Sequence, residues 1–217
     1  MYSYYYFIIN IKSQSFTNIF NNTKPIILLE LICRCFPGEL LRDLANKDNL
    51  TIKVVTDFFR ELNCVEFLIF VDGNVPQEDE QFSNALKNLQ PHILPEHQQR
   101  IALVFSMFET PNLQQYRNDI EKFAETFFPR TVNALDDFSE YKNCDVSYFA
   151  CSAFGLIKED GKLVPNVQYI GREDWSHFGV IKDPKRWTPF GVVAPIYWLL
   201  TGEHDKRLLK IELLRYS

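Results

Sequence analysis

The residues best suited to chemistry in this sequence are polar side chains that follow directly on apolar runs. Asp72 follows one such run, and Glu109 and Ser152 follow two others. In open α/β sheets, functional residues lie just past the carboxyl ends of buried strands. These three positions are therefore candidates for one shared site, provided that the runs before them are strands of one sheet.

The run before Asp72 is the clearest of them. Residues Val65–Val71 are apolar except for Glu66, and they lead into the turn-forming residues Asp72, Gly73 and Asn74. A short, nearly continuous apolar run of this kind is typical of a strand buried on both faces. Such a strand needs helices above and below it.

Similar patterns extend along the chain. Apolar runs predict further strands at 26–32, 101–105 and 146–151. Helical spacing predicts helices beginning at Glu39 and over 51–62, 82–89, 113–128, 131–140 and 191–201. Pro129 is expected to end the fourth of these helices, and Gly202 to cap the last. This alternation predicts an α/β domain with a mainly parallel sheet and flanking helices.

The domain organisation follows from composition. Residues 1–24 have little charge and are interpreted as an edge strand, at about Tyr4–Ile11, or as a poorly ordered tail. Residues 25–217 then form one domain. The polar stretch at about 156–189 is too long for an ordinary loop, and it predicts an insertion or a lid.

Bulk properties limit the classes of partner. The chain has 217 residues, a net charge of −5 and a pI near 5.4, which argues against a nucleic-acid binder. No apolar run reaches the roughly 18 residues of a membrane span. Five cysteines, an odd number, predict reduced and mostly buried thiols in a cytoplasmic protein.

Four segments follow the apolar runs in order: Pro37-Gly38-Glu39, Asp72-Gly73, Ser106-Met107-Phe108-Glu109 and Ser152-Ala153-Phe154. Their order and spacing resemble the later part of a P-loop GTPase domain. The sequence is most similar to divergent translation-factor-related GTPases of bacteria, including double-GTPase and conflict-system proteins. The resemblance covers about residues 26–201.

The resemblance implies roles for six residues: Gly38, Glu39, Ser106, Glu109, Ser152 and Ala153. Gly38 and Glu39 stand in the second switch, where the N–H group of the glycine could touch a γ-phosphate. Ser106 and Glu109 stand in the base-recognition loop, where the carboxylate could accept hydrogen bonds from guanine N1 and N2. Backbone N–H groups at 152–154 could donate to guanine O6.

The sequence also departs from that family. Cys35 stands where a magnesium-linked Asp is expected, and Met107 replaces the Lys of the base-recognition loop. No G-x-x-x-x-G-K-[ST] motif is present, and Gly38 is the earliest of the 8 glycines. The resemblance therefore implies a domain truncated at its N-terminal strand and phosphate loop, which leaves magnesium and triphosphate without their usual anchor.

Simpler interpretations remain open for each of these residues. Pro37 and Gly38 can form an ordinary turn before a helix, and Asp72 can be a turn former. Glu109 can be a solvated charge at a helix N-terminus, an interpretation that we favour over a base contact. Ser152 can cap a turn.

The sequence also contains residues of two other kinds of site. Cys33 and Cys35 form a C-x-C pair without the further ligands that zinc needs, so no metal site is predicted. His177 lies near Asp174 in a polar loop and could act as an acid or base in a hydrolase. A Cys151–His177 nucleophile pair is a minor alternative.

The leading hypothesis is a degenerate GTPase-like protein that acts as a regulatory or scaffolding component of a bacterial multi-protein system. It would bind a protein partner. Guanine nucleotide is its one candidate ligand, and the protein would bind this nucleotide weakly or not at all. One alternative is a GTP hydrolase completed by a partner chain or a longer N-terminus. The other is the hydrolase that uses Asp174 and His177.

Overall fold

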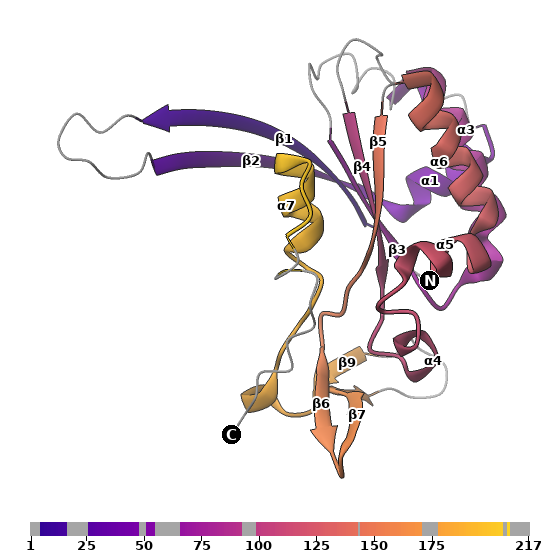
Figure 1. Cartoon of the computed structure of the whole chain (residues 1–217). Helices are drawn as coiled ribbons and strands as arrows, with labels where there is room; N and C mark the ends of the chain where they lie inside the picture. Colours follow the sequence, from indigo (N-terminus) through magenta and orange to yellow (C-terminus); the bar gives the residue numbers. More distant parts are fainter. Residues whose placement is uncertain are drawn as a thin grey trace.

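A five-stranded sheet forms the centre of the computed structural model, which describes residues 5–16, 26–47, 51–54, 66–92, 99–142, 144–170, 178–205 and 208. The strands are β1 Tyr5–Phe16, β2 Ile26–Pro37, β3 Glu66–Asp72, β4 Gln99–Ser106 and β5 Cys144–Ala150. They lie in the order β2-β1-β3-β4-β5 (Figure 1). β3, β4 and β5 are parallel, whereas β1 is antiparallel to both of its neighbours. The α/β class is confirmed, but parallel pairing is limited to three of the five strands.

The N-terminal strand does not lie at the edge of the sheet, where the sequence analysis placed it. β1 pairs with β2 along its full length of 12 residues, and it also pairs with β3 from Tyr6 to Ile9. A buried strand such as β3 would otherwise leave a row of unpaired backbone groups on that side. Residues 5–16 therefore belong to the same sheet as the later strands, and β2 is the edge strand.

The parallel strands bury both of their faces, as predicted for the run before Asp72. On one face, Phe67, Leu103 and Phe105 belong to a core completed by helices α1, α3, α5 and α6. On the other, Leu68 and Val104 pack with residues of α7 (Figure 1). The bounds are α1 Gly38–Ala45, α3 Asp79–Leu89, α5 Ile120–Phe127, α6 Pro129–Lys142 and α7 Ala194–Thr201.

The prediction of one long helix over 113–128 is wrong. The chain instead forms a short helix, α4 Pro111–Gln114, then turns, then α5. Asp119 has a non-helical backbone, and its side chain accepts a hydrogen bond from the N–H group of Lys122, so it starts a new helix. Pro129 begins α6, because proline has no N–H group to lose in a first helical turn.

One buried carboxylate ties α3 to α6. Asp79, the first residue of α3, accepts hydrogen bonds from the N–H groups of Arg130 at 3.0 Å and Thr131 at 2.8 Å. These groups have no partner within α6, because they belong to its first turn. The Asp79 carboxylate therefore caps a helix to which it does not belong, and fixes how the two helices pack.

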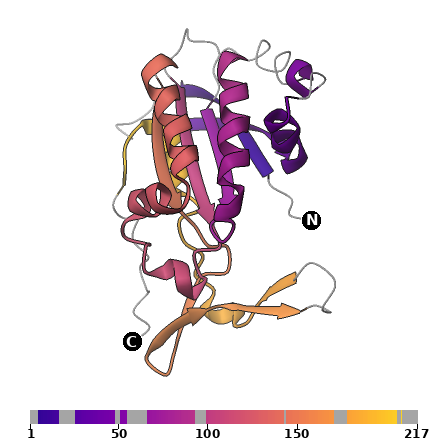
Figure 2. The same ribbon diagram turned by 90° about the vertical axis from the view of Figure 1, so that its right-hand side faces the viewer.

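The polar stretch at 156–189 is folded where the structure describes it. It forms two small antiparallel sheets, β6 Leu156–Glu159 with β7 Lys162–Pro165 and β8 Val167–Ile170 with β9 Phe178–Ile181. A short 3-10 helix, η3 Pro184–Arg186, follows. These elements lie beyond the carboxyl ends of the parallel strands (Figures 1 and 2). We refer to residues 156–190 as the insertion.

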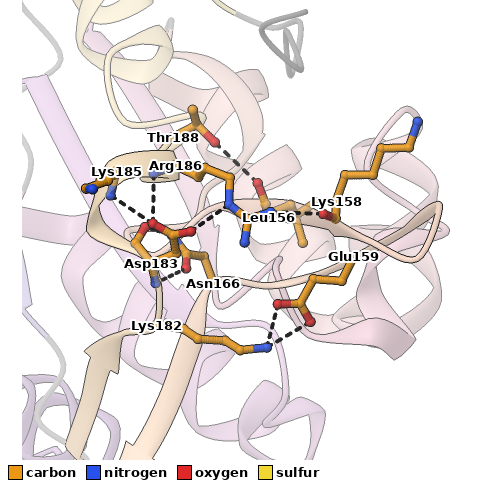
Figure 3. A network of polar contacts seen from close by, with 9 residues as sticks. All are labelled: Leu156, Lys158, Glu159, Asn166, Lys182, Asp183, Lys185, Arg186 and Thr188. Atoms are coloured by element: carbon orange, nitrogen blue, oxygen red, sulfur yellow. Dashed lines mark hydrogen bonds and ion pairs between the residues drawn. The ribbon is translucent and has the colours of Figure 1, made fainter. Parts of the chain in front are cut away.

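A polar network holds the insertion together (Figure 3). Asn166, which is 0% exposed, donates to the Asp183 carbonyl at 3.0 Å and accepts from the Asp183 N–H group at 2.8 Å. Asp183 in turn accepts from the Arg186 side chain at 2.6 Å, and Arg186 reaches the Lys158 carbonyl at 3.0 Å. Side-chain hydrogen bonds thus join β6, the residue between β7 and β8, and η3.

Two further predictions concern helices. Gly202 ends α7 in the left-handed conformation, with φ of 73°, so its prediction as the cap is confirmed. The helix predicted over 51–62 is present at 51–54, and the remainder lies outside the described residues. In the part of the chain that the structure describes, no helix combines the length and apolar character needed to cross a bilayer.

Candidate functional site

The predicted site segments gather at one end of the sheet, where the carboxyl ends of the parallel strands lie. Asp72 ends β3, Ser106 ends β4, and Ser152 lies just past β5, so all three are at the carboxyl ends of parallel strands. β2 runs in the same direction as β3, because both are antiparallel to β1. Gly38, which begins α1 directly after β2, therefore lies at the same end, about 10 Å from β3 across two strand spacings.

The loop after β4 is held in an unusual conformation. Met107 has a φ of 64°, in the left-handed region that residues other than glycine rarely adopt. Phe108 is 0% exposed, and its N–H group donates to the Cys151 carbonyl at 3.1 Å. Burial of the Phe108 ring and this hydrogen bond to the end of β5 hold the loop in place. Strain of this kind is found preferentially at functional sites.

Glu109 is the most unusual residue of the site. It is only 1% exposed, and neither of its carboxylate oxygens has a hydrogen-bond partner among the described residues. Burial raises the pKa of Glu109 above its ordinary value, and the Ser152 hydroxyl offsets only part of that rise. The interpretation of Glu109 as a solvated helix charge is therefore wrong, because this carboxylate does not reach solvent.

The polar groups of Ser152 are engaged within the protein. Its hydroxyl accepts a hydrogen bond from the N–H group of Gly155 at 2.8 Å, which is the turn cap that the sequence analysis left open. Its own N–H group donates to the Phe190 carbonyl at 3.0 Å. The carbonyl of Ala153 accepts from the Trp187 indole at 2.7 Å. The N–H group of Ser152 is thus not free to bind a ligand in this structure.

Asp72 and Ser106 also have internal roles. The Asp72 carboxylate accepts hydrogen bonds from the N–H group of Asn74 at 2.9 Å and from its side chain at 3.1 Å, as a turn former does. The Ser106 hydroxyl donates to the Val71 carbonyl at 3.2 Å. Of the predicted site side chains described here, Glu109 alone makes no hydrogen bond of ordinary geometry, and the nearby Ser152 hydroxyl only partly offsets the rise of its pKa.

Two glycines allow the chain to close around the end of β5. A Cβ atom at Gly191 would lie 1.8 Å from the Ala150 carbonyl oxygen, and one at Gly155 would lie 2.0 Å from that of Thr188. Both glycines have positive φ values, 68° and 74°. The approach of residues 188–191 to the end of β5 therefore requires glycine at both positions.

Tyr169 of β8 was not predicted as part of the site. Tyr169 is 49% exposed, and its pKa is raised, first by partial burial and then by the charges of Glu109 and Asp72. The insertion therefore brings an aromatic ring near the carboxylates of β3 and of the loop after β4. No pattern in the sequence indicates this proximity, because it depends on how the insertion folds back.

A second polar cluster lies at the opposite end of the sheet. Glu66 of β3 is 7% exposed, and its Oε1 lies 3.6 Å from Nη1 of Arg100 in β4. Arg100 also donates to the Leu199 carbonyl of α7 at 2.9 Å. Burial raises the pKa of Glu66 to about 7, although the nearby Arg100 charge acts in the other direction. The sequence showed Glu66 only as the exception in an apolar run.

The described residues give no support to the other candidate sites, which are a metal site, a cysteine nucleophile and a hydrolase site. Within the described ranges, no group of His, Cys, Asp and Glu residues could hold a metal ion. Cys151 is buried, and burial raises its pKa to about 12, so it is not a reactive thiolate at neutral pH. Asp174 and His177, on which the hydrolase alternative depends, lie outside the described residues. Only backbone placement is described for Cys35 and Glu39.

Comparison of the chain with protein families, with curated proteins and with solved structures found no match.

Proposed function

We propose that this chain is a degenerate GTPase-like protein that serves as a regulatory or scaffolding component and binds guanine nucleotide weakly or not at all. The observation that carries the proposal is the state of Glu109, the residue at the base-recognition position of the resemblance. Its carboxylate oxygens are buried without a partner. A buried carboxylate that lacks a well-formed hydrogen bond costs free energy, so its presence needs an explanation, and a weakly retained base-recognition position supplies one.

Two further observations support weak binding rather than a working GTPase site. The N–H group of Ser152, at the position that would donate to guanine O6, is already bonded to the Phe190 carbonyl. The sequence contains no phosphate-binding G-x-x-x-x-G-K-[ST] motif to hold a triphosphate and its magnesium ion. A guanine base would have to displace internal contacts, and the phosphates would add little affinity.

The proposal is tested by titrating the purified chain with fluorescent GTP and ATP analogues, with and without magnesium. We expect either no saturable binding, or weak binding that prefers guanine, does not depend on magnesium and is lost in the Glu109→Gln variant. Glu140→Gln is the matched control, because Glu140 is exposed on α6, away from the site. Tight, magnesium-dependent binding of GTP would overturn the proposal.

The role as a regulatory component has its own test. The chain should bind a protein partner whether or not GTP is present, because the proposed function does not depend on hydrolysis. Cross-linking and mass spectrometry in bacterial cells would identify that partner. A GTPase activity that appears when a partner carrying a phosphate-binding motif is added would instead support the GTP hydrolase completed by a partner chain.

A further inference from the structure

Among the described strands, β2 has a neighbour on one side only. It is the outermost strand of the sheet, and no other strand in the described part of the chain pairs with its free side. β2 is 12 residues long, and its only proline, Pro37, is its last residue. A long edge strand of this kind presents a row of backbone donors and acceptors that can pair with another strand.

Beyond Ile9, β1 pairs with β2 alone among the described strands. β1 pairs with β3 from Tyr6 to Ile9, so the ladder from Asn10 to Phe16 is made with β2 alone. Figure 1 shows this part of the hairpin projecting from the sheet. A two-stranded ribbon is marginally stable by itself, whereas three or more strands can be independently stable. A further strand beside β2 would give the projecting ribbon a third strand and so stabilise it.

The sequence of β2 is suited to pairing with a second copy of itself. A regular antiparallel ladder between two identical strands has its twofold axis at a residue that lies opposite its own copy. Two such registers give the greatest overlap for β2, centred on Leu31 or on Ile32. Only the register at Ile32 places Glu30 opposite Arg34 of the second copy, and by symmetry it does so twice.

The two registers differ in charge pairing. Centring on Leu31 would instead place Glu30 opposite Ile32, and Arg34 opposite Leu28. Glu30 and Arg34 are the charged residues of β2, so this register leaves both charges facing apolar residues. Opposite charges that face each other across a ladder are favourable, and like charges are not. The charges of β2 are therefore complementary to those of a second copy, and they favour the register centred on Ile32.

We propose that two copies of this chain associate through β2, in an antiparallel ladder centred on Ile32, to form one continuous ten-stranded sheet. The interface is isologous, because the same strand contributes both sides. This inference does not depend on the proposed function, because the ladder is formed by the backbone of Ile26–Pro37, whereas the nucleotide candidates Gly38 and Glu39 follow that strand and the others lie after β4 and β5.

The test is the molar mass of the purified chain, measured by sedimentation and light scattering over a wide concentration range. The wild-type chain should be a dimer. Arg34→Glu places Glu opposite Glu30 of the second copy, and Glu30→Arg places Arg opposite Arg34. Each variant should weaken the dimer by on the order of tenfold or more, because two attractive pairs become repulsive. Arg42→Glu, an equal change of charge on α1, should leave the dimer intact.

Mixing the two variants is the decisive step. In a heterodimer of Arg34→Glu with Glu30→Arg, both opposing pairs again carry opposite charges, so the mixture should recover the dimer. The double variant E30R/R34E should also dimerise with itself, and it keeps the experiment conclusive if one single variant does not fold. A monomeric wild-type chain, a dimer unaffected by the single substitutions, or a mixture that stays monomeric would each overturn the proposal.

Discussion

Glu66 and Arg100 lie side by side on neighbouring parallel strands, with Oε1 of the first 3.6 Å from Nη1 of the second. This ion pair is largely buried, with side chains 9% and 22% exposed. Burial raises the pKa of Glu66 from the ordinary value of 4.5 to about 7. In the range between these two values the unfolded chain loses a proton that the folded chain keeps, so stability must fall as pH rises.

The first prediction follows from that pKa. The free energy of unfolding should fall by about 3 kcal/mol as pH rises from 4.5 to 7, because each unit of the Glu66 pKa shift corresponds to about 1.4 kcal/mol. Glu66→Gln should remove this part of the pH dependence, as measured by urea denaturation across the range. Glu140→Gln should retain the wild-type profile, because Glu140 is exposed. Identical profiles for the wild type and Glu66→Gln would show that Glu66 titrates normally.

The second prediction concerns the glycines at the end of β5. Gly191→Ala should destabilise the fold by about 2 kcal/mol or more, because it combines a positive φ with a Cβ atom 1.8 Å from the Ala150 carbonyl oxygen. Gly161→Ala is the control, because Gly161 also has a positive φ but no atom within 4 Å of the added Cβ. Thermal unfolding should show a clearly larger loss for Gly191→Ala, and equal losses would exclude the close approach.

The third prediction separates stability from binding at Glu109. Replacing this unpartnered buried acid by Leu should leave stability unchanged or raise it by about 1–3 kcal/mol near neutral pH, since it removes an uncompensated polar group. Because burial raises its pKa, the gain should be absent in acid, where Glu109 is protonated in both states, and should grow as pH rises. Urea denaturation provides the measurement. A loss of stability at neutral pH would mean that the carboxylate has a partner that stabilises the fold.

The fourth prediction concerns the insertion. Asn166→Ala should loosen residues 156–170 and 178–190, at a cost of about 1–3 kcal/mol, because it removes two hydrogen bonds between the fully buried Asn166 side chain and the backbone of Asp183. Hydrogen exchange should rise there and remain unchanged in β3, β4 and β5. Lys182→Ala removes an ion pair with Glu159 that is partly exposed, so its effect should be below about 1 kcal/mol. Uniform exchange changes across the sheet would contradict this local role.

Much of the parallel sheet can be predicted from the sequence. The apolar runs placed β3, β4 and β5 to within two residues at each end, because strands buried on both faces need continuous apolar residues. The turn role left open for Asp72 is what the structure shows, and it follows from side-chain chemistry within two residues of the chain. Predictions of this kind depend only on neighbours in the sequence.

The site shows where such reasoning stops. Both Glu109 and Ser152 were correctly expected at the carboxyl end of the sheet. Glu109 was expected in solvent because it precedes a predicted helix, yet it is buried. The break between α4 and α5 was missed for a related reason. Asp119 is compatible with the polar face of one long amphipathic helix, and equally with the N-cap of a new helix. Periodicity alone does not distinguish these two possibilities.

The sequence by itself determined the α/β class, the three parallel strands and the lack of a phosphate-binding motif. The tertiary structure alone decided that β1 lies between β2 and β3, that Glu109 is enclosed, and that Glu66 faces Arg100. The physical reason is the range of the interactions. Apolar periodicity and turn chemistry act between near neighbours in the chain, whereas strand order and the burial of a single carboxylate depend on segments brought together only by folding.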